Sequence, residues 1–255
     1  MTEAEVEDFM RFVLTPRRRA RPRLAEPLRD AQDVDVDAAQ GPVAAWRMGE
    51  GPAILCVHGW EDDNALWGPF LSLCRQAGRA AVVLDLPAHG FSHGDLCAAP
   101  DAADAILAVA ARLGPIDALV AHSFGGPCSV LAMTRGLEAT RAAFIACPLG
   151  RMRRWQRIGR EVGADPALIE AARALYAQRY GAAAQFDVCE AAPRLSARAL
   201  FVHSVDDEQV DADASREAAA AWPDAELLLL DGLGHRLIAQ DDAVLMRVFD
   251  FLDAA

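Results

Sequence analysis

The stretch VAHSFGGP, residues 120–127, places a serine where an apolar run ends and a helical pattern begins. A serine on a very tight turn between a strand and a helix can act as a nucleophile, and the residues two before and two after it must then be small. Ala121 and Gly125 occupy these positions. Such a turn lifts the hydroxyl of Ser123 out of the sheet and directs the amide of Phe124 toward a developing oxyanion. A serine that only caps a helix gives the same short pattern, so the chemistry depends on the rest of the chain.

Six apolar runs that could position this serine follow one another between residues 53 and 231. They read AILCVH, AAVVLD, IDALVAH, AAFIAC, ARALFVHS and AELLLLD, and such unalternated runs are typical of strands buried on both faces. Helical patterns lie near residues 65–77, 101–113, 124–136, 211–222 and 241–253. This order predicts an α/β fold with a doubly wound, mostly parallel sheet. The earlier segments DVDVDA and PVAAWRM predict an antiparallel hairpin at the N-terminal edge of that sheet.

Two segments do not fit the alternation of strands and helices. Residues 1–30 hold a short amphipathic stretch, VEDFMRFVL, and a connector rich in arginine and proline, which together predict a peripheral helix and strap. Residues 148–197 separate two strands by more than one crossover needs, and their helical patterns predict an inserted helical cap. The core then consists of residues 31–147 and 198–255.

Charge and composition indicate which partners, metals and locations to expect. The net charge of −12 would repel a phosphate backbone, so we expect no nucleic-acid partner. No segment reaches the roughly eighteen uninterrupted apolar residues of a membrane span, and no apolar region follows the basic residues 16–23, so we expect a cytoplasmic protein. The six cysteines are spread singly, without the spacing of a disulfide scaffold or a zinc site, and we expect no metal. All 25 basic residues are arginines and alanine is abundant, which indicates a GC-rich bacterial source.

Five separated motifs resemble the α/β-hydrolase superfamily, in which nucleophile, acid and histidine occur in that chain order. The resemblance covers about residues 34–254 and includes, in order, VHGW, DLPAHGFSHG, AHSFGG, LFVHSVDDEQV and DGLGHRLI. It implies an α/β-hydrolase fold. Two alanines depart from the usual glycines: Ala88 in the second motif and Ala121 in the third.

The resemblance implies a role for each candidate site residue. Ser123 would be the nucleophile, His235 the base and then the acid, and Asp207 the carboxylate that fixes the tautomer of the imidazole. The backbone N–H groups of Trp60 and Phe124 would form the oxyanion hole.

The same resemblance chooses between two adjacent carboxylates. The superfamily pattern places an apolar residue three positions after the acid, and Val210 stands in that relation to Asp207, whereas Gln209 stands so to Asp206. The chain after AAFIAC, where some relatives keep the acid, offers no carboxylate in residues 148–150. We therefore expect Asp207 to orient His235.

The other histidines and one cysteine have structural interpretations. We expect His58 and His89 to hold backbone groups by hydrogen bonds, His122 to pack inside the elbow and His203 to be buried or bonded to backbone. His93 should be exposed on its loop, and Cys128 should belong to the core.

The cap contains the unusual stretch RMRRWQRIGREV, residues 151–162. A helical projection groups Arg153, Arg157 and Arg160 on one face and Trp155, Ile158 and Val162 on the other. The apolar face should roof the pocket while the arginines face water; the alternative is a landing site for phosphorylated acyl carriers such as coenzyme A or acyl-carrier protein. We expect the mainly apolar pocket to be formed by Met152, Trp155, Leu175 and Tyr176, together with Trp60 and Phe124.

These residues predict a serine hydrolase that cleaves a carboxylic ester or thioester through an acyl-enzyme on Ser123. The substrate would be a small acyl ester or thioester, and the chemistry needs no cofactor. The same triad could instead transfer acyl groups to another acceptor or cleave a carbon-carbon bond. A non-catalytic ligand-binding member of the fold is the alternative from another class.

Overall fold

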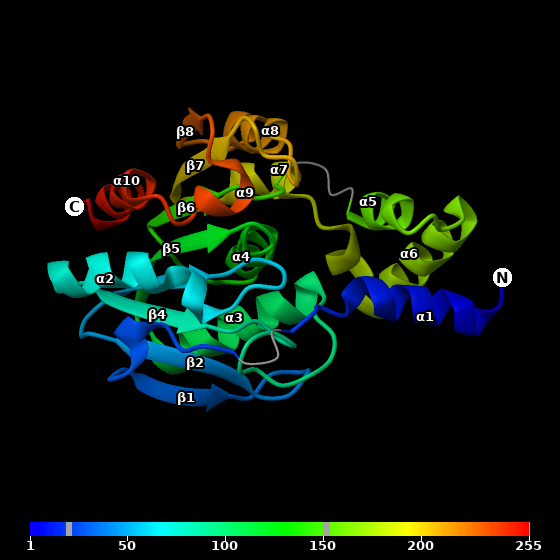
Figure 1. Ribbon diagram of the computed structural model, residues 1–255, viewed down its shortest axis with the longest axis horizontal. Helices are drawn as coiled ribbons and strands as arrows, with labels where there is room; N and C mark the ends of the chain where they lie inside the picture. Colours follow the sequence, from blue (N-terminus) through cyan, green and yellow to red (C-terminus); the bar gives the residue numbers. More distant parts are fainter. Residues whose placement is uncertain (19–21, 150–153, 255) are drawn as a thin grey trace.

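The computed structural model describes residues 1–18, 22–149 and 154–254, and within them eight strands form one sheet. The strand order is β1-β2-β4-β3-β5-β6-β7-β8 (Figure 1). The strands are β1 (Gln32–Val36), β2 (Val43–Met48), β3 (Ala53–Val57), β4 (Ala80–Leu84), β5 (Ile116–His122), β6 (Arg141–Ile145), β7 (Arg198–Ser204) and β8 (Ala225–Leu230).

The pairing of the strands follows their sequence patterns. β1 pairs antiparallel with β2, and β2 pairs antiparallel with β4, while every pair from β4 to β8 is parallel. β3 and β4 are apolar and buried along their whole length, as strands covered on both faces must be. The prediction of a mostly parallel sheet with an antiparallel N-terminal edge hairpin is therefore confirmed.

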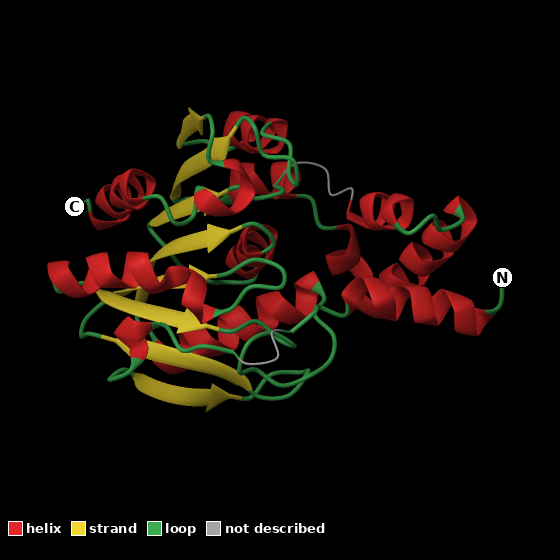
Figure 2. Ribbon diagram, in the orientation of Figure 1, coloured by secondary structure: helices red, strands yellow, loops and turns green. Residues whose placement is uncertain are grey.

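Helices cover both faces of the sheet, which Figure 2 shows in red around the yellow strands. The described helices are α1 (Glu3–Leu14), α2 (Gly68–Ala77), α3 (Ala99–Leu113), α4 (Gly125–Thr134), α5 (Arg154–Glu161), α6 (Pro166–Tyr180), α7 (Val188–Ala191), α8 (Asp213–Ala221), α9 (Gly234–Leu237) and α10 (Asp242–Asp253). One apolar core lies between the sheet and α3, α4, α7 and α8, and a second lies between the sheet and α2 and α10. This arrangement is the predicted doubly wound fold. No described helix is long and apolar enough to cross a membrane.

Local sequence explains where the core helices begin and end. The carboxylate of Asp241 accepts a hydrogen bond from the amide of Val244 at 3.0 Å and so caps the start of α10. Gly78 ends α2 in the left-handed conformation, with φ of +68°, which costs a glycine little. Each helix buries an apolar face against the sheet, and this fixes the loops at the carboxyl ends of the strands.

The segment between β6 and β7 contains α5, α6 and α7, at the position expected for a cap. α5 and α6 stand beside the sheet at the carboxyl ends of its parallel strands, and α1 lies along α6 (Figure 1). The three helices share an apolar cluster of their own, formed by Phe9, Met10, Val13, Leu14, Trp155, Ile169, Ala172 and Tyr176 together with Ala98. The N-terminal helix, expected to be peripheral, thus packs against α6. α7 instead contributes Val188 to the core of the sheet.

Candidate active site

Ser123 lies on the turn between β5 and α4, in the left-handed conformation with φ of +50°. Its amide donates to the carbonyl of Ile145 on the neighbouring strand β6 at 3.0 Å, which anchors the turn. Crowding explains the small residue two positions on, because a Cβ on Gly125 would stand 2.5 Å from the carbonyl oxygen of His58. The strained turn therefore holds the hydroxyl of Ser123 at the carboxyl end of the central strand β5.

His235 joins the serine to a carboxylate. Its Nε2 lies 2.9 Å from the Oγ of Ser123, and its Nδ1 lies 2.7 Å from Oδ2 of Asp207. Because an ionised carboxylate only accepts, Nδ1 carries the proton and Nε2 presents its lone pair to the serine hydroxyl. The hydroxyl of Ser123 can therefore donate its proton to His235.

Asp207 is the centre of a set of donors after β7. Its Oδ1 accepts from the amides of Gln209 and Val210 at 2.8 and 2.9 Å, and its Oδ2 faces His235 and the buried ring of His203. Burial by itself would raise the pKa of Asp207, but the hydrogen bonds from His203, His235 and Val210 hold that pKa well below its ordinary value. The carboxylate therefore stays ionised.

Asp206 points to different partners. It accepts from the hydroxyl of Ser204 and from the amide of Gly234 at 3.1 Å, so it ties the acid loop to the histidine loop without touching the imidazole of His235. The structure thus brings Ser123, His235 and Asp207 together.

His203 contributes a support that the sequence did not reveal. Its Nε2 lies 3.0 Å from the carbonyl of Val210 and 3.3 Å from Oδ2 of Asp207, and its Nδ1 lies 2.7 Å from the hydroxyl of Ser215. Two acceptors beside Nε2 require that this nitrogen carries the proton. The expected burial and backbone contact of His203 are present. Its position four residues before Asp207, at the end of β7, was the available signal for the additional contact.

The VHGW loop after β3 approaches the serine closely. A Cβ on Gly59 would stand 2.8 Å from the Cβ of Ser123, so the absence of a side chain lets this loop lie against the nucleophile. The rings of Trp60 and Phe124 meet edge to face with 5.3 Å between their centroids. Phe124 is the N-cap residue of α4, where the positive end of the helix dipole lies.

The DLPAHGFSHG loop after β4 is held in place by hydrogen bonds between two histidine side chains and its backbone. His58 accepts from the amide of Leu86 at 2.9 Å, and His89 Nδ1 lies 2.9 Å from the carbonyl of Pro87, so both form the expected hydrogen bonds to backbone. The buried carboxylate of Asp85 would be 2.1 Å from a Cβ on Gly90, which explains that glycine. Ala88, which stands in place of the usual glycine, adopts φ of +64°.

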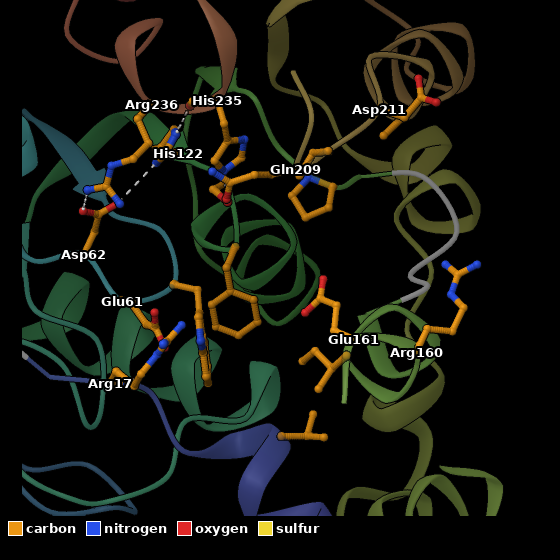
Figure 3. A pocket seen from close by; sticks show the side chains of 18 of the residues that line it. Arg17, Glu61, Asp62, His122, Arg160, Glu161, Gln209, Asp211, His235 and Arg236 are labelled. Atoms are coloured by element: carbon orange, nitrogen blue, oxygen red, sulfur yellow. Dashed lines mark hydrogen bonds and ion pairs between the residues drawn. The ribbon is translucent and has the colours of Figure 1, made fainter. Parts of the chain in front are cut away.

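Asp62 and Arg236 form a contact between the chain that follows the VHGW motif and the loop that carries His235. The carboxylate of Asp62 is 3% exposed and pairs with the guanidinium of Arg236. The ring of His122 lies between this pair and the ring of His235 (Figure 3). His122 Nε2 lies 3.0 Å from the carbonyl of His235 and Nδ1 lies 3.9 Å from Asp62. Burial, followed by the nearby charge of His235, lowers the pKa of His122 to about 4, so the ring is neutral at neutral pH. Sequence analysis did not single out Asp62 or Arg236.

A cavity of about 890 Å³ opens over Ser123 and His235. Figure 3 shows Glu61 and Arg17 on one side of it and Arg160 and Glu161 of α5 on the other. The apolar lining comes from α1, from the aromatic rings beside Ser123, from α5 and from the residue after α5: Phe12, Val13, Trp60, Phe124, Ile158 and Val162. The side toward α8 is polar and includes Gln209, Asp211, Asp213 and Glu217.

The cap residues expected in the pocket have other positions. Trp155 and Tyr176 are buried against each other, with 5.3 Å between ring centroids, and Leu175 packs beside them in the cluster between α1 and α6. None of these three lines the cavity, because the start of α5 faces α6 and only its later turns face the pocket. Met152 and Arg153 lie outside the described residues, as does the side chain of Arg157. Arg160 is exposed and borders the cavity.

The parallel sheet, the serine turn after β5 and the histidine loop after β8 define an α/β-hydrolase. A model of the alpha/beta hydrolase family matches residues 54–247, and the chain belongs to this family.

Known proteins resemble the chain in sequence and in fold. It is 31% identical over 99 residues to a pimeloyl-(acyl-carrier protein) methyl ester esterase of Xanthomonas campestris; the alignment covers 39% of this chain and 38% of that relative. An esterase from Pyrococcus furiosus has a TM-score of 0.73 at 16% identity, covering 94% of this chain and 98% of the other. For an esterase from a Rhodococcus species the TM-score is 0.67 at 19% identity, with 87% and 98% covered. The Pyrococcus and Rhodococcus esterases therefore have the same fold as this chain.

Proposed function

We propose that the protein is a serine hydrolase that cleaves a carboxylic ester or thioester through an acyl-enzyme on Ser123. One observation carries the proposal: the imidazole of His235 lies 2.9 Å from the serine Oγ and 2.7 Å from the carboxylate of Asp207. The name of the Xanthomonas relative, a methyl ester esterase, supports an ester as the substrate. The large cavity over the serine supports a small molecule.

During acylation, His235 transfers the proton of Ser123 to the leaving group. During deacylation, it transfers a proton of water back to Ser123. His235 Nε2 accepts the proton of Ser123 while Oγ attacks the carbonyl carbon, and the same nitrogen then protonates the departing alcohol or thiol. Water, deprotonated by His235, attacks the acyl carbon of the acyl-enzyme. The acid departs as the proton returns to Ser123. Asp207 remains ionised and stabilises the imidazolium that forms in both halves.

The tetrahedral oxyanion would be held by the backbone N–H groups of Trp60 and Phe124. Two features support this assignment. Phe124 stands at the N-terminus of α4, and the close approach of Gly59 brings the backbone before Trp60 against the nucleophile. Preorganised amides of this kind contribute about 3–4 kcal/mol each to stabilisation of the transition state.

A fluorophosphonate probe tests the proposal directly. The wild type should be labelled, Ser123→Ala should not, and the wild type should hydrolyse p-nitrophenyl esters or acyl-coenzyme A. A folded wild type without labelling would contradict the proposal and favour a ligand-binding protein. Labelling without hydrolysis would favour acyl transfer or carbon-carbon cleavage by the same triad.

A further inference from the structure

The N-terminal helix α1 forms one wall of the catalytic cavity. Its residues Phe9, Met10, Val13 and Leu14 are buried, and they hold the helix against α6. Phe12 points from another side of the helix and lines the cavity together with Val13. The first segment of the chain therefore contributes directly to the surface that a substrate meets.

Contacts at the end of α1 fix this wall to the active-site loops. The carbonyl of Leu14 accepts from the amide of Cys97 at 2.8 Å, and the amide of Arg17 donates to the carboxylate of Glu61 at 3.0 Å. Glu61 follows Trp60 directly and has φ of +60°. Arg18 Nε donates to the carbonyl of Ala88 at 2.8 Å. These bonds bind the N-terminal segment to the loops that follow β3 and β4, so the wall has a defined position.

α5 and the residue that follows it provide apolar side chains for the same cavity. Ile158 and Val162 line it together with Phe12 and Val13. Phe12 is 56% exposed and Val162 is 51% exposed, although both are large apolar side chains. Apolar surface left open on two elements that border one cavity is what a bound apolar group would cover.

The two ends of the cavity differ in chemistry. Trp60 and Phe124 continue the apolar lining from Ser123 toward α1 and α5, where Arg160 and Glu161 also border the cavity. The side toward α8 carries Gln209, Asp211, Asp213 and Glu217, beside the small apolar side chains of Val210 and Ala214. An ester has an acyl part and an alcohol part on opposite sides of the reacting carbon. The apolar end suits a hydrocarbon acyl chain, and the polar end suits the departing alcohol. A volume of about 890 Å³ is near the top of the roughly 300–1,000 Å³ range of small-molecule sites, far more than an acetyl group fills.

We propose that Phe12 of α1 and Val162, which directly follows α5, determine substrate specificity by enclosing the distal part of a medium-length apolar acyl chain. The inference rests on the proposed function, because it assigns the acyl side of the substrate to one end of the same cavity. It makes the N-terminal helix part of the active site.

The test compares p-nitrophenyl octanoate with p-nitrophenyl acetate in Phe12→Ala and Val162→Ala. Each substitution should lower the octanoate-to-acetate ratio of kcat/KM by about 5–10-fold, mainly through KM for octanoate, because buried apolar contact with the distal chain is lost. Met246→Ala is the matched control: Met246 on α10 is 55% exposed and does not line this cavity. Its ratio should equal that of the wild type.

The outcomes separate this inference from the proposed function. If the wild type hydrolyses both esters and the ratio stays constant in Phe12→Ala and Val162→Ala, the inference is wrong and the hydrolase remains. The inference is also overturned if the two substitutions instead alter the preference among octyl, butyl and methyl acetates, because the apolar end would then hold the alcohol. A folded wild type that hydrolyses none of these esters and resists the fluorophosphonate contradicts both.

Discussion

At the scale of single residues, the two adjacent carboxylates after β7 have different contacts. Asp207 accepts four hydrogen bonds, including the one that fixes the tautomer of His235, while Asp206 bonds only to groups that shape the loops, Ser204 and Gly234, among the contacts described above. The choice of Asp207 from an apolar residue three positions later agrees with this geometry. The resemblance to the superfamily could predict it because the motif that carries this carboxylate, LFVHSVDDEQV, is continuous in sequence.

Replacing each carboxylate separately tests this difference. Asp207→Asn should lower kcat by up to about ten-thousandfold, because the amide would favour the wrong tautomer of His235. Asp206→Asn is the matched control and should lower kcat by less than about tenfold. Steady-state kinetics on one p-nitrophenyl ester, with circular dichroism to verify folding, measure both. A larger loss in Asp206→Asn would move the orienting role to Asp206.

At the scale of elements, the strands and core helices could be predicted because each has a local sequence pattern, an unalternated apolar run for the buried strands and a helical period for the helices. The element against which the apolar face of a helix packs could not be predicted in the same way. The amphipathic stretch in residues 1–30 indicates a helix, but its apolar face meets α6, which is distant in the chain. The projection of residues 151–162 grouped Trp155 with Ile158 and Val162, yet Trp155 packs against α6 while the other two line the cavity. A single apolar face can serve two environments, and sequence period does not distinguish them.

The pair of Asp62 and Arg236 gives a prediction about two loops. Asp62 is buried and lies just after the VHGW motif, whereas Arg236 is about half exposed and directly follows His235. Arg236→Met should leave the carboxylate without this cation, destabilise the fold by on the order of 2 kcal/mol and lower kcat about tenfold with little change in KM, since the histidine loop loses a contact that positions it.

Arg216→Met provides the control for this loop contact. Arg216 pairs with Asp213 on the surface of α8, where such a pair contributes at most about 1 kcal/mol. Urea unfolding and steady-state kinetics should therefore separate the two variants. Equal behaviour of the two variants in both measurements would show that Arg236 does not position the histidine loop.

At the scale of the whole molecule, buried ionisable groups link stability to pH with opposite signs. The pKa of His122 is lowered to about 4 by burial and by the neighbouring His235, with Asp62 and Arg236 facing the same ring. In the unfolded chain, His122 binds a proton as the pH falls below about 6.5, whereas in the folded protein it binds one only near pH 4. The stability that depends on neutral His122 is complete above pH 6.5 and is lost as pH falls toward 4. Burial raises the pKa of Asp85, which works in the opposite direction.

The contribution of His122 can be isolated by comparing two proteins that share every other group. Between pH 7.5 and pH 4, the wild type should lose about 3 kcal/mol more unfolding free energy than His122→Asn, because asparagine does not titrate and can still donate a hydrogen bond to the carbonyl of His235. The shifts of Asp85 and Asp207 occur in both proteins and cancel in the difference. Urea denaturation at a series of pH values measures it. If the two proteins lost stability in parallel across that range, the ring of His122 would have to titrate at the same pH in the folded and the unfolded protein, and the lowered pKa of the buried ring would be wrong.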